Sequence, residues 1–185
     1  MIAIFRSLKE YVIEKLRGEI STKRLIEMGM RVGKNLHRER GIIIDYSHCW
    51  LIRMGDNVRI GQRAHILAHD GSTKLDLNYT KIGLVDIGDN VFIGAESIIL
   101  PNVKIGNNVI IGAGCVVSKN IPDDAIVVGN PAQIIGKTSD YLAKHKANLG
   151  KRPVFDEKWT IRNNISQEQK EKMIEMLRDG IGYVE

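Results

Sequence analysis

A six-residue spacing of aliphatic side chains runs through the middle of the chain. From Ile87 an aliphatic residue returns at every sixth position as far as Val117, and the same register occurs upstream from Met54 to Ile66. This period suits neither an amphipathic helix nor a simple alternating strand. It is typical of a chain that turns a corner every six residues, so that successive coils stack as short parallel strands. The sequence therefore predicts an all-β solenoid.

Two positions in each six-residue repeat are expected to point into the core. They are the aliphatic first position and the fifth, which is occupied by Val58, Ala64, Val91, Ser97, Val103, Val109, Cys115 and Ile121. The stretches between them, such as Gly88-Asp89-Asn90, predict tight corners. Glycine tolerates a positive φ there, and asparagine is the next best residue.

Composition limits the function without naming it. The 185 residues suit one main domain, and the net charge of +5 comes from 27 basic and 22 acidic residues that are interspersed. Such mixed charge describes a solvated surface and requires no nucleic-acid partner. Cys49 and Cys115 make a poor disulfide pair, since Cys115 occupies a core position. A reducing, cytoplasmic location is therefore expected.

The first 17 residues have the spacing of an amphipathic helix and no continuous apolar run. We therefore expect neither a secretory signal nor a membrane span in this segment. The helix is expected to cover the first coil, because solenoids need caps at their open ends. Contact with a membrane surface is a less favoured alternative.

Four segments carry more specific signals than the repeat itself. They are Ile66-Leu67-Ala68-His69-Asp70, Val91-Phe92-Ile93-Gly94-Ala95, Gly112-Ala113-Gly114-Cys115-Val116-Val117-Ser118-Lys119 and Gly129-Asn130-Pro131-Ala132. With the repeats between about Val32 and Ile135, they resemble the hexapeptide-repeat acyltransferases. The most similar branch is that of the O-acetyltransferases acting on maltose, galactosides and surface polysaccharides. The resemblance implies a left-handed parallel β-helix, whereas the general rule favours right-handed crossovers.

Three parts are predicted along the chain. They are an N-terminal helical cap (1–31), a β-helix acyltransferase domain (32–136) with an excursion at 72–86, and a C-terminal helical extension (137–185). The excursion breaks the six-residue register, and long insertions in compact domains are often functional. Helices are expected over 139–147 and 166–178, the second with Ser166 as its N-cap.

His69 is the candidate catalytic residue, because it lies where the regular coil ends and the excursion begins. The resemblance implies that this histidine takes the proton from an acceptor hydroxyl while that oxygen attacks the thioester of acetyl-CoA. A neutral imidazole suits the task. No Gly-x-Ser-x-Gly motif is present, so direct transfer without an acyl-enzyme is expected.

Two aspartates lie near this histidine in the sequence. Asp70 is adjacent to His69, but neighbours on a strand point to opposite sides, so Asp70 is expected to anchor the loop. Asp45 lies about one and a half coils upstream and resembles the acceptor-binding aspartate of sugar acetyltransferases. The partner that orients His69 stays open at this point.

The resemblance also implies residues for the coenzyme. Ala95 and Ala113 match positions that contact the pantetheine arm, and Ser118 and Lys119 match a pair that reaches the nucleotide end. The family's next basic positions are occupied here by Gln133 and Gly136, with Lys137 as the nearest substitute. The family is trimeric, so a homotrimer with shared sites is expected, in which the excursion covers a neighbour's site.

Two rival functions remain beside the acetyltransferase. His48, His65 and His69 are spaced so that they could hold zinc, as in carbonic anhydrases of this fold. Against this, those enzymes carry a Gly-His pair where this chain has Gly88-Asp89, so no metal is expected. The other rival is a non-catalytic solenoid that serves as a binding scaffold. The favoured prediction is an acetyl-CoA-dependent O-acetyltransferase acting on a sugar hydroxyl, in surface polysaccharide biosynthesis.

Overall fold

The computed structural model describes residues 19–185, so the helix predicted over 1–17 lies outside the described residues. The described chain forms two units, the first ending at Thr138 and the second comprising Ser139–Glu185. Within the described residues, no helix combines the length and apolar character needed to cross a bilayer.

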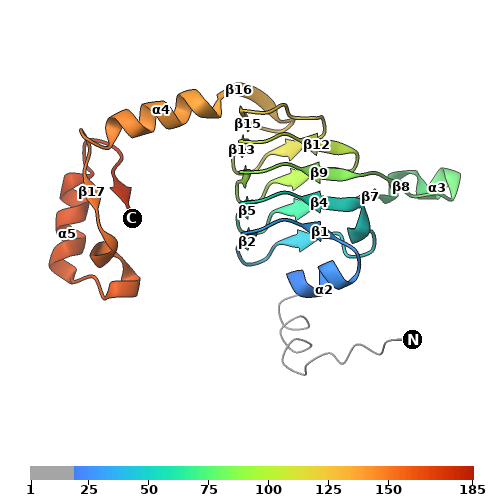
Figure 1. Cartoon of the computed structure of the whole chain (residues 1–185), viewed down its shortest axis with the longest axis horizontal. Coiled ribbons are helices and arrows are strands. Elements are labelled where there is room, and N and C mark those ends of the chain that lie inside the picture. Colours follow the sequence, from blue (N-terminus) through green and yellow to red (C-terminus); the bar gives the residue numbers. More distant parts are fainter. Residues whose placement is uncertain (1–18) are drawn as a thin grey trace. The chain divides into compact units, whose positions relative to one another are not determined.

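Short parallel strands stack into three sheets in the first unit, one above the other as in Figure 1. The first sheet contains β1 (Arg31–Val32), β4 (Ile52–Met54), β9 (Val85–Ile87) and β12 (Val103–Ile105). The second contains β2 (His37–Arg38), β5 (Arg59–Ile60), β10 (Phe92–Ile93), β13 (Ile110–Ile111), β15 (Ala125–Val128) and β16 (Gln133–Lys137). The third contains β3 (Ile43–Ile44), β6 (His65–Ile66), β11 (Ile98–Ile99) and β14 (Val116–Val117). Each of the four complete coils therefore contributes one strand to each sheet, β16 pairs antiparallel with β15 at the end of the stack, and the predicted parallel β-helix is confirmed.

Most of the core of this unit consists of the two predicted positions of each repeat. The aliphatic first positions from Ile87 to Val117 are at most 1% exposed. The fifth positions are as well covered, ranging from Val58 at 0% to Ile121 at 6%. Ser97 is the polar member, and its hydroxyl donates to the carbonyl of Gly112 at 2.8 Å, so its burial leaves no unmet donor. The six-residue pattern thus predicted the core of the regular coils residue by residue, whereas core residues such as Leu25, Ile42 and Cys49 lie outside it.

The corner between the first and second sheets differs from the expectation. Positive φ is supplied by Asn35, Asn57, Asn90 and Asn108, not by the glycines that precede them. Their side chains hydrogen-bond from coil to coil at 2.9 to 3.1 Å. Gly94 serves close stacking instead, because an added Cβ would lie 2.5 Å from the backbone nitrogen of Ala113.

Two features distinguish the first coil of the stack, which precedes β4, from the regular coils. Helix α2 (Thr22–Glu27) contributes the fully buried Leu25 to the core and begins at Ser21, whose hydroxyl accepts from Arg24 N–H. The segment between β3 and β4 contains the short 3₁₀ helix η1 (Cys49–Leu51). Paired residues of the first two coils are consequently 22 positions apart, against 18 in the regular coils.

The excursion starts earlier and ends earlier than 72–86. It is a hairpin of β7 (His69–Asp70) and β8 (Lys81–Ile82) that encloses η2 (Gly71–Thr73) and α3 (Lys74–Leu77), and it projects from the stack in Figure 1. The third coil resumes with β9 at Val85, which is buried. Antiparallel pairing of residues near both ends, which the six-residue pattern does not encode, sets these bounds.

The second unit begins within α4 (Thr138–Asn148). It also contains β17 (Val154–Phe155) paired with β18 (Tyr183–Val184), the 3₁₀ helices η3 (Glu157–Trp159) and η4 (Ile161–Asn163), and α5 (Gln167–Met176). The predicted N-cap is present, with Ser166 and Gln169 forming a reciprocal capping box. The expected boundary at 136/137 lies two residues before the division, because β16 pairs with β15 as far as Lys137.

Candidate active site

The candidate site lies at one corner of the β-helix, between the third sheet and the first. This site corner comprises residues 45–51, 67–84, 100–102 and 118–120, one segment for each coil. Asp45 directly follows β3, and its N–H donates to the carbonyl of Ile66 at 2.9 Å. Asp45 therefore lies one coil from His69, not one and a half, because the extra residues at 45–51 shift the sequence spacing.

Asp45 and His69 form a hydrogen-bonded pair. Oδ2 of Asp45 lies 2.5 Å from Nδ1 of His69 and accepts from Ala68 N–H at 3.0 Å. Oδ1 accepts from Ser47 twice, from its N–H at 3.1 Å and from its hydroxyl at 2.7 Å. Asp45 is 4% exposed, whereas the His69 side chain is 41% exposed. A buried carboxylate thus holds one nitrogen of a histidine whose ring reaches solvent.

The ionisation of Asp45 follows from these contacts. Burial would raise the pKa of its carboxyl, but the hydrogen bonds from Ser47, His69 and Ala68 favour the charged form and lower the pKa overall. Because a carboxylate only accepts, Nδ1 of His69 carries the proton and Nε2 of the neutral ring is left with its lone pair. This is the tautomer that a general base acting through Nε2 requires.

Two residues that the sequence did not assign to the catalytic group lie beside this pair. Ser47 Oγ is 2.9 Å from Nδ1 of His48 and 3.4 Å from Nδ1 of His69. The ring centroids of His48 and His69 are 5.3 Å apart, and those of His48 and Trp50 are 5.4 Å apart. The sequence suggested His48 only as a possible zinc ligand. The register shift that brings it to His69 could have been recognised only by counting the extra residues between Ile44 and Ile52.

Asp70 anchors the excursion, as expected. Its carboxylate accepts from Ser72 N–H at 2.8 Å and pairs with Lys81 Nζ at 2.6 Å across the β7–β8 hairpin. The hydrogen bonds from Lys81 and Ser72 lower the pKa of the Asp70 carboxyl to about 2. Asp70 is thereby committed to the hairpin, and the carboxylate that contacts His69 is Asp45.

The residues predicted to contact the coenzyme lie at two different corners. Ser118 and Lys119 are exposed and directly follow β14, at the site corner and two coils beyond His69. Ala95 and Ala113 are stacked at the preceding corner, between the second and third sheets, where Gly114 N–H donates to the Ala95 carbonyl at 2.8 Å. The width of the third sheet separates the two groups within one chain.

A group of possible metal ligands overlaps the site. Among the described residues, Asp45, His48 and His69 each offer one ligand atom within 4.8 Å of the others. His65, the third histidine of the zinc hypothesis, is outside this group, on β6. The carboxylate of Asp45 already accepts four hydrogen bonds, so a metal would have to displace some of them.

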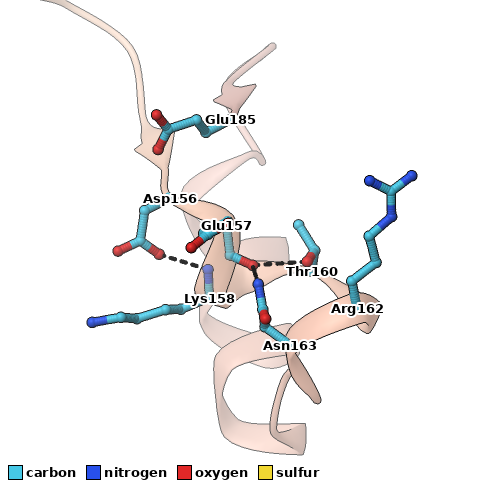
Figure 2. Close-up of a pocket in the computed structure, with 7 residues that line it drawn as sticks. All are labelled: Asp156, Glu157, Lys158, Thr160, Arg162, Asn163 and Glu185. Atoms are coloured by element: carbon cyan, nitrogen blue, oxygen red, sulfur yellow. Dashed lines mark hydrogen bonds between the residues drawn. The ribbon is translucent and has the colours of Figure 1, made fainter.

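Hollows occur in both units. One of about 290 Å³ in the first unit is lined by Arg31, Trp50, Leu51, Ile52, Arg53, Leu84, Val85 and Asp86. Another, of about 860 Å³, lies in the second unit. Figure 2 shows the residues that line it, which are Asp156, Glu157, Lys158, Thr160, Arg162, Asn163 and Glu185. The hydroxyl of Thr160 and the amide of Asn163 both donate to the Glu157 carbonyl at 2.7 Å, which leaves the rim mainly charged. No predicted site residue lines this second hollow, whereas the first adjoins His48 through Trp50.

Comparison with known proteins identifies the repeat and the fold. Residues 85–119 match the family model of the bacterial transferase hexapeptide (six repeats). A search of curated protein sequences finds no match. Among solved structures, a hexapeptide-repeat-containing acetyltransferase from Vibrio cholerae O1 biovar eltor, complexed with acetyl-CoA, is 27% identical with a TM-score of 0.54. That alignment covers 60% of this chain, which spans only 61% of the Vibrio protein.

Two further structures have similar scores over a larger share. A maltose O-acetyltransferase from Clostridium difficile 630 is 29% identical, with a TM-score of 0.52 over 69% of this chain and 85% of that one. A galactoside acetyltransferase in complex with coenzyme A is 25% identical, with a TM-score of 0.55 over 71% and 79%. The resemblance expected from the motifs is confirmed: the chain contains the bacterial transferase hexapeptide repeat, and its fold is similar to that of hexapeptide-repeat acetyltransferases, as the predicted left-handed β-helix requires.

Proposed function

We propose that this protein transfers an acetyl group from acetyl-CoA to a hydroxyl group of a sugar. The observation that carries the proposal is the hydrogen-bonded Asp45–His69 pair at the site corner. A buried carboxylate that fixes the tautomer of a solvent-accessible imidazole is the arrangement expected of a general base. We assign Asp45 to the orientation of His69 and not to the acceptor, because its two oxygens already accept four hydrogen bonds.

The reaction proceeds in one transfer without an acyl-enzyme. Nε2 of His69 takes the proton of the acceptor hydroxyl while that oxygen bonds to the thioester carbonyl carbon. The C–S bond then breaks, and the departing thiolate of CoA receives the proton back from the imidazolium. Asp45 stabilises the positive charge that His69 carries between the two proton transfers.

The donor is acetyl-CoA, and its binding is proposed to need two chains. Ala95 and Ala113 lie at one corner, and His69, Ser118 and Lys119 lie along the next. Leu100 follows Ala95 by five positions, which sets an upper limit of roughly 17 Å for an extended chain. A pantetheine arm that contacts the alanines of one chain can reach the histidine corner of a neighbouring prism, where two stacked coils form one side of a deep cleft.

A homotrimer supplies three such clefts with closed symmetry. The excursion supports this assembly, because its apolar side chains are uncovered in the single chain: Leu75 is 94% exposed and Tyr79 is 78% exposed. Monomers rarely leave large apolar side chains together in solvent without a partner. Light scattering on the purified protein is therefore expected to give about three times the monomer mass of 20.8 kDa. An active monomer would contradict both the assembly and the shared site.

The sugar acceptor, in surface polysaccharide biosynthesis, is proposed from the resemblance and from the names of two similar structures. These are a maltose O-acetyltransferase and a galactoside acetyltransferase. The test is release of CoA thiol from acetyl-CoA in the presence of a panel of mono- and disaccharides, with mass spectrometry of the acetylated product. Acetylation of any sugar supports the function. Absence of product across the panel, together with hydration of CO₂ by a zinc-loaded sample, would favour the hydratase instead.

A further inference from the structure

His48 is held by the same polar network as His69. The hydroxyl of Ser47 donates its one proton to Oδ1 of Asp45 at 2.7 Å. Toward Nδ1 of His48, 2.9 Å away, Ser47 Oγ can therefore act only as an acceptor. Nδ1 of His48 consequently carries the proton, and Nε2 of the neutral ring keeps its lone pair.

Asp45 thus fixes two histidines in one tautomer, His69 by direct contact and His48 through Ser47. Both Nδ1 atoms face the Asp45–Ser47 pair, at distances of 2.5 Å and 2.9 Å from their acceptors. Because the in-plane directions of the two ring nitrogens of an imidazole diverge widely, the lone pair of each Nε2 points away from this anchor. The ring centroids are 5.3 Å apart, with an angle of 42° between the planes. The site therefore presents two neighbouring acceptors where one general base would suffice.

We propose that His48 accepts a hydrogen bond from a second hydroxyl of the acceptor, next to the one that His69 deprotonates. This inference rests on the proposed function and extends it: the acceptor is a sugar with two adjacent hydroxyls, and His48 determines that specificity. His48 does not move the reacting proton. A site that hydrogen-bonds a substrate hydroxyl discriminates against an analogue that lacks it, because the site's polar group is then left unpaired.

The surroundings of His48 fit the body of a sugar ring. Trp50, whose ring centroid is 5.4 Å from that of His48, is 53% exposed and lines the hollow of about 290 Å³ together with Arg31 and Leu84. An aromatic face beside polar groups offers the apolar and polar contacts that a sugar needs. The acceptor would thus extend from His69 past His48 toward Trp50.

The kinetic test uses the best acceptor of the sugar panel and its deoxy analogue. Product analysis first locates the acetylated oxygen, and the analogue lacks the hydroxyl on the neighbouring carbon. For the wild-type protein, kcat/KM is expected to be about 10- to 100-fold lower with the deoxy sugar, the range of one lost polar contact. His48→Phe retains a ring against Trp50 but has no lone pair, so it should show less than a twofold difference between the two sugars.

The variants distinguish a failure of this inference from a failure of the proposed function. His48→Phe should use the deoxy sugar about as well as wild type, whereas a merely structural role would lower both sugars equally. His37→Phe, a change at an exposed histidine of the second sheet, is the control and should keep the wild-type preference. If His48→Phe keeps the full preference for the diol, or loses both sugars equally, the inference is overturned while the proposed function stands. If no sugar is acetylated, the proposed function itself fails.

A second measurement needs no acceptor. The ¹⁵N chemical shifts of the imidazoles report which nitrogen is protonated, and at a pH where both rings are neutral we expect Nδ1–H in His48 and His69. Ser47→Ala removes the acceptor of His48 and should change the tautomer equilibrium of His48 while leaving that of His69. Nε2–H as the main form of His48 in the wild-type protein would overturn the inference.

Discussion

The coils from Val85 to Val117 and the site corner are built by different means. In the regular coils, paired residues are 18 positions apart, and the same contact repeats at each level, as in the hydrogen bond from Asn90 to Asn108. At the site corner, extra residues interrupt the stacking, and the contacts occur once. Asp45 there joins Ser47, Ala68 and His69, which no repeat would bring together.

The difference shows how this fold can accommodate a polar site of the proposed kind. A parallel ladder satisfies the backbone hydrogen bonds and fills the core. Its tight corners leave little freedom to orient a particular side chain. Inserted residues do not have to follow the repeat, so they can place a carboxylate within hydrogen-bonding distance of an imidazole. The regular coils then supply the rigid support that fixes both inserted segments one coil apart.

The largest effect is expected from His69→Ala. Removal of a positioned general base lowers kcat about 10²- to 10⁴-fold, while acetyl-CoA binding and folding should persist because His69 lies outside the core. Steady-state kinetics and thermal unfolding measure the two. His37→Ala is the matched control and should keep the wild-type rate. Near-normal turnover by His69→Ala would remove the site corner from the chemistry.

Asp45→Asn tests whether Asp45 orients His69. An amide cannot accept all four hydrogen bonds, and its NH₂ group opposes one of the present donors, so the tautomer of His69 is no longer fixed. We expect kcat to fall roughly 10²-fold or more, with a loss of about 1–3 kcal/mol in the free energy of unfolding. Asp70→Asn changes the adjacent carboxylate and should spare kcat. Equal effects of the two substitutions would contradict the assignment.

The sequence predicted the regular coils almost completely and the site only in part. Period and corner chemistry identified the buried positions because each repeat obeys the same packing rule. His69 could be proposed as the catalytic residue because a motif and a break in register coincide there. The partnership with Asp45 was missed, since it depends on a four-residue difference in the length of one coil, visible only when Ile43 is paired with His65.

The glycines show a similar limit of prediction from sequence. Their presence predicted corners correctly, but at the corner between the first and second sheets the positive φ belongs to asparagines, whose side chains hydrogen-bond between residues 18 to 33 positions apart. The start of the excursion at His69 likewise depends on the antiparallel pairing of His69 with Ile82. Such pairings between distant residues cannot be predicted from a local sequence pattern.

Gly94→Ala tests the regular half of the comparison. The added Cβ would lie 2.5 Å from Ala113 N and 2.6 Å from Gly112 C, both backbone atoms that cannot rotate away. We expect a loss of about 1–3 kcal/mol in the free energy of unfolding, measured by urea denaturation. Gly71→Ala, in the excursion, meets nothing within 4 Å and should change stability by less than about 0.5 kcal/mol. Similar losses in both variants would show that the coils are no more tightly packed than the insertion.

The pH dependence of stability provides a smaller effect at Asp45. Because its pKa is lowered in the folded protein, ionised Asp45 stabilises the fold above its ordinary pKa of 3.8. That contribution is lost as pH falls through the lowered folded value. The difference in unfolding free energy between wild type and Asp45→Asn should therefore be full at pH 6 and shrink below about pH 4. A difference that stays constant over this range would show that the charge of Asp45 is not what its contacts stabilise.

The smallest effect is expected from Lys119→Ala, at the regular end of the site corner. An exposed ammonium on a phosphate is screened by water, and such pairs contribute less than about 1 kcal/mol, so KM for acetyl-CoA should rise about two- to fivefold. Since the contact is remote from the reacting carbonyl, it stabilises the bound donor and the transition state alike, and kcat should be spared. Lys104→Ala, an exposed lysine on the first sheet, is the control and should leave both constants unchanged. A fall in kcat with an unchanged KM would place Lys119 beside the thioester, and so move the donor's nucleotide end away from this corner.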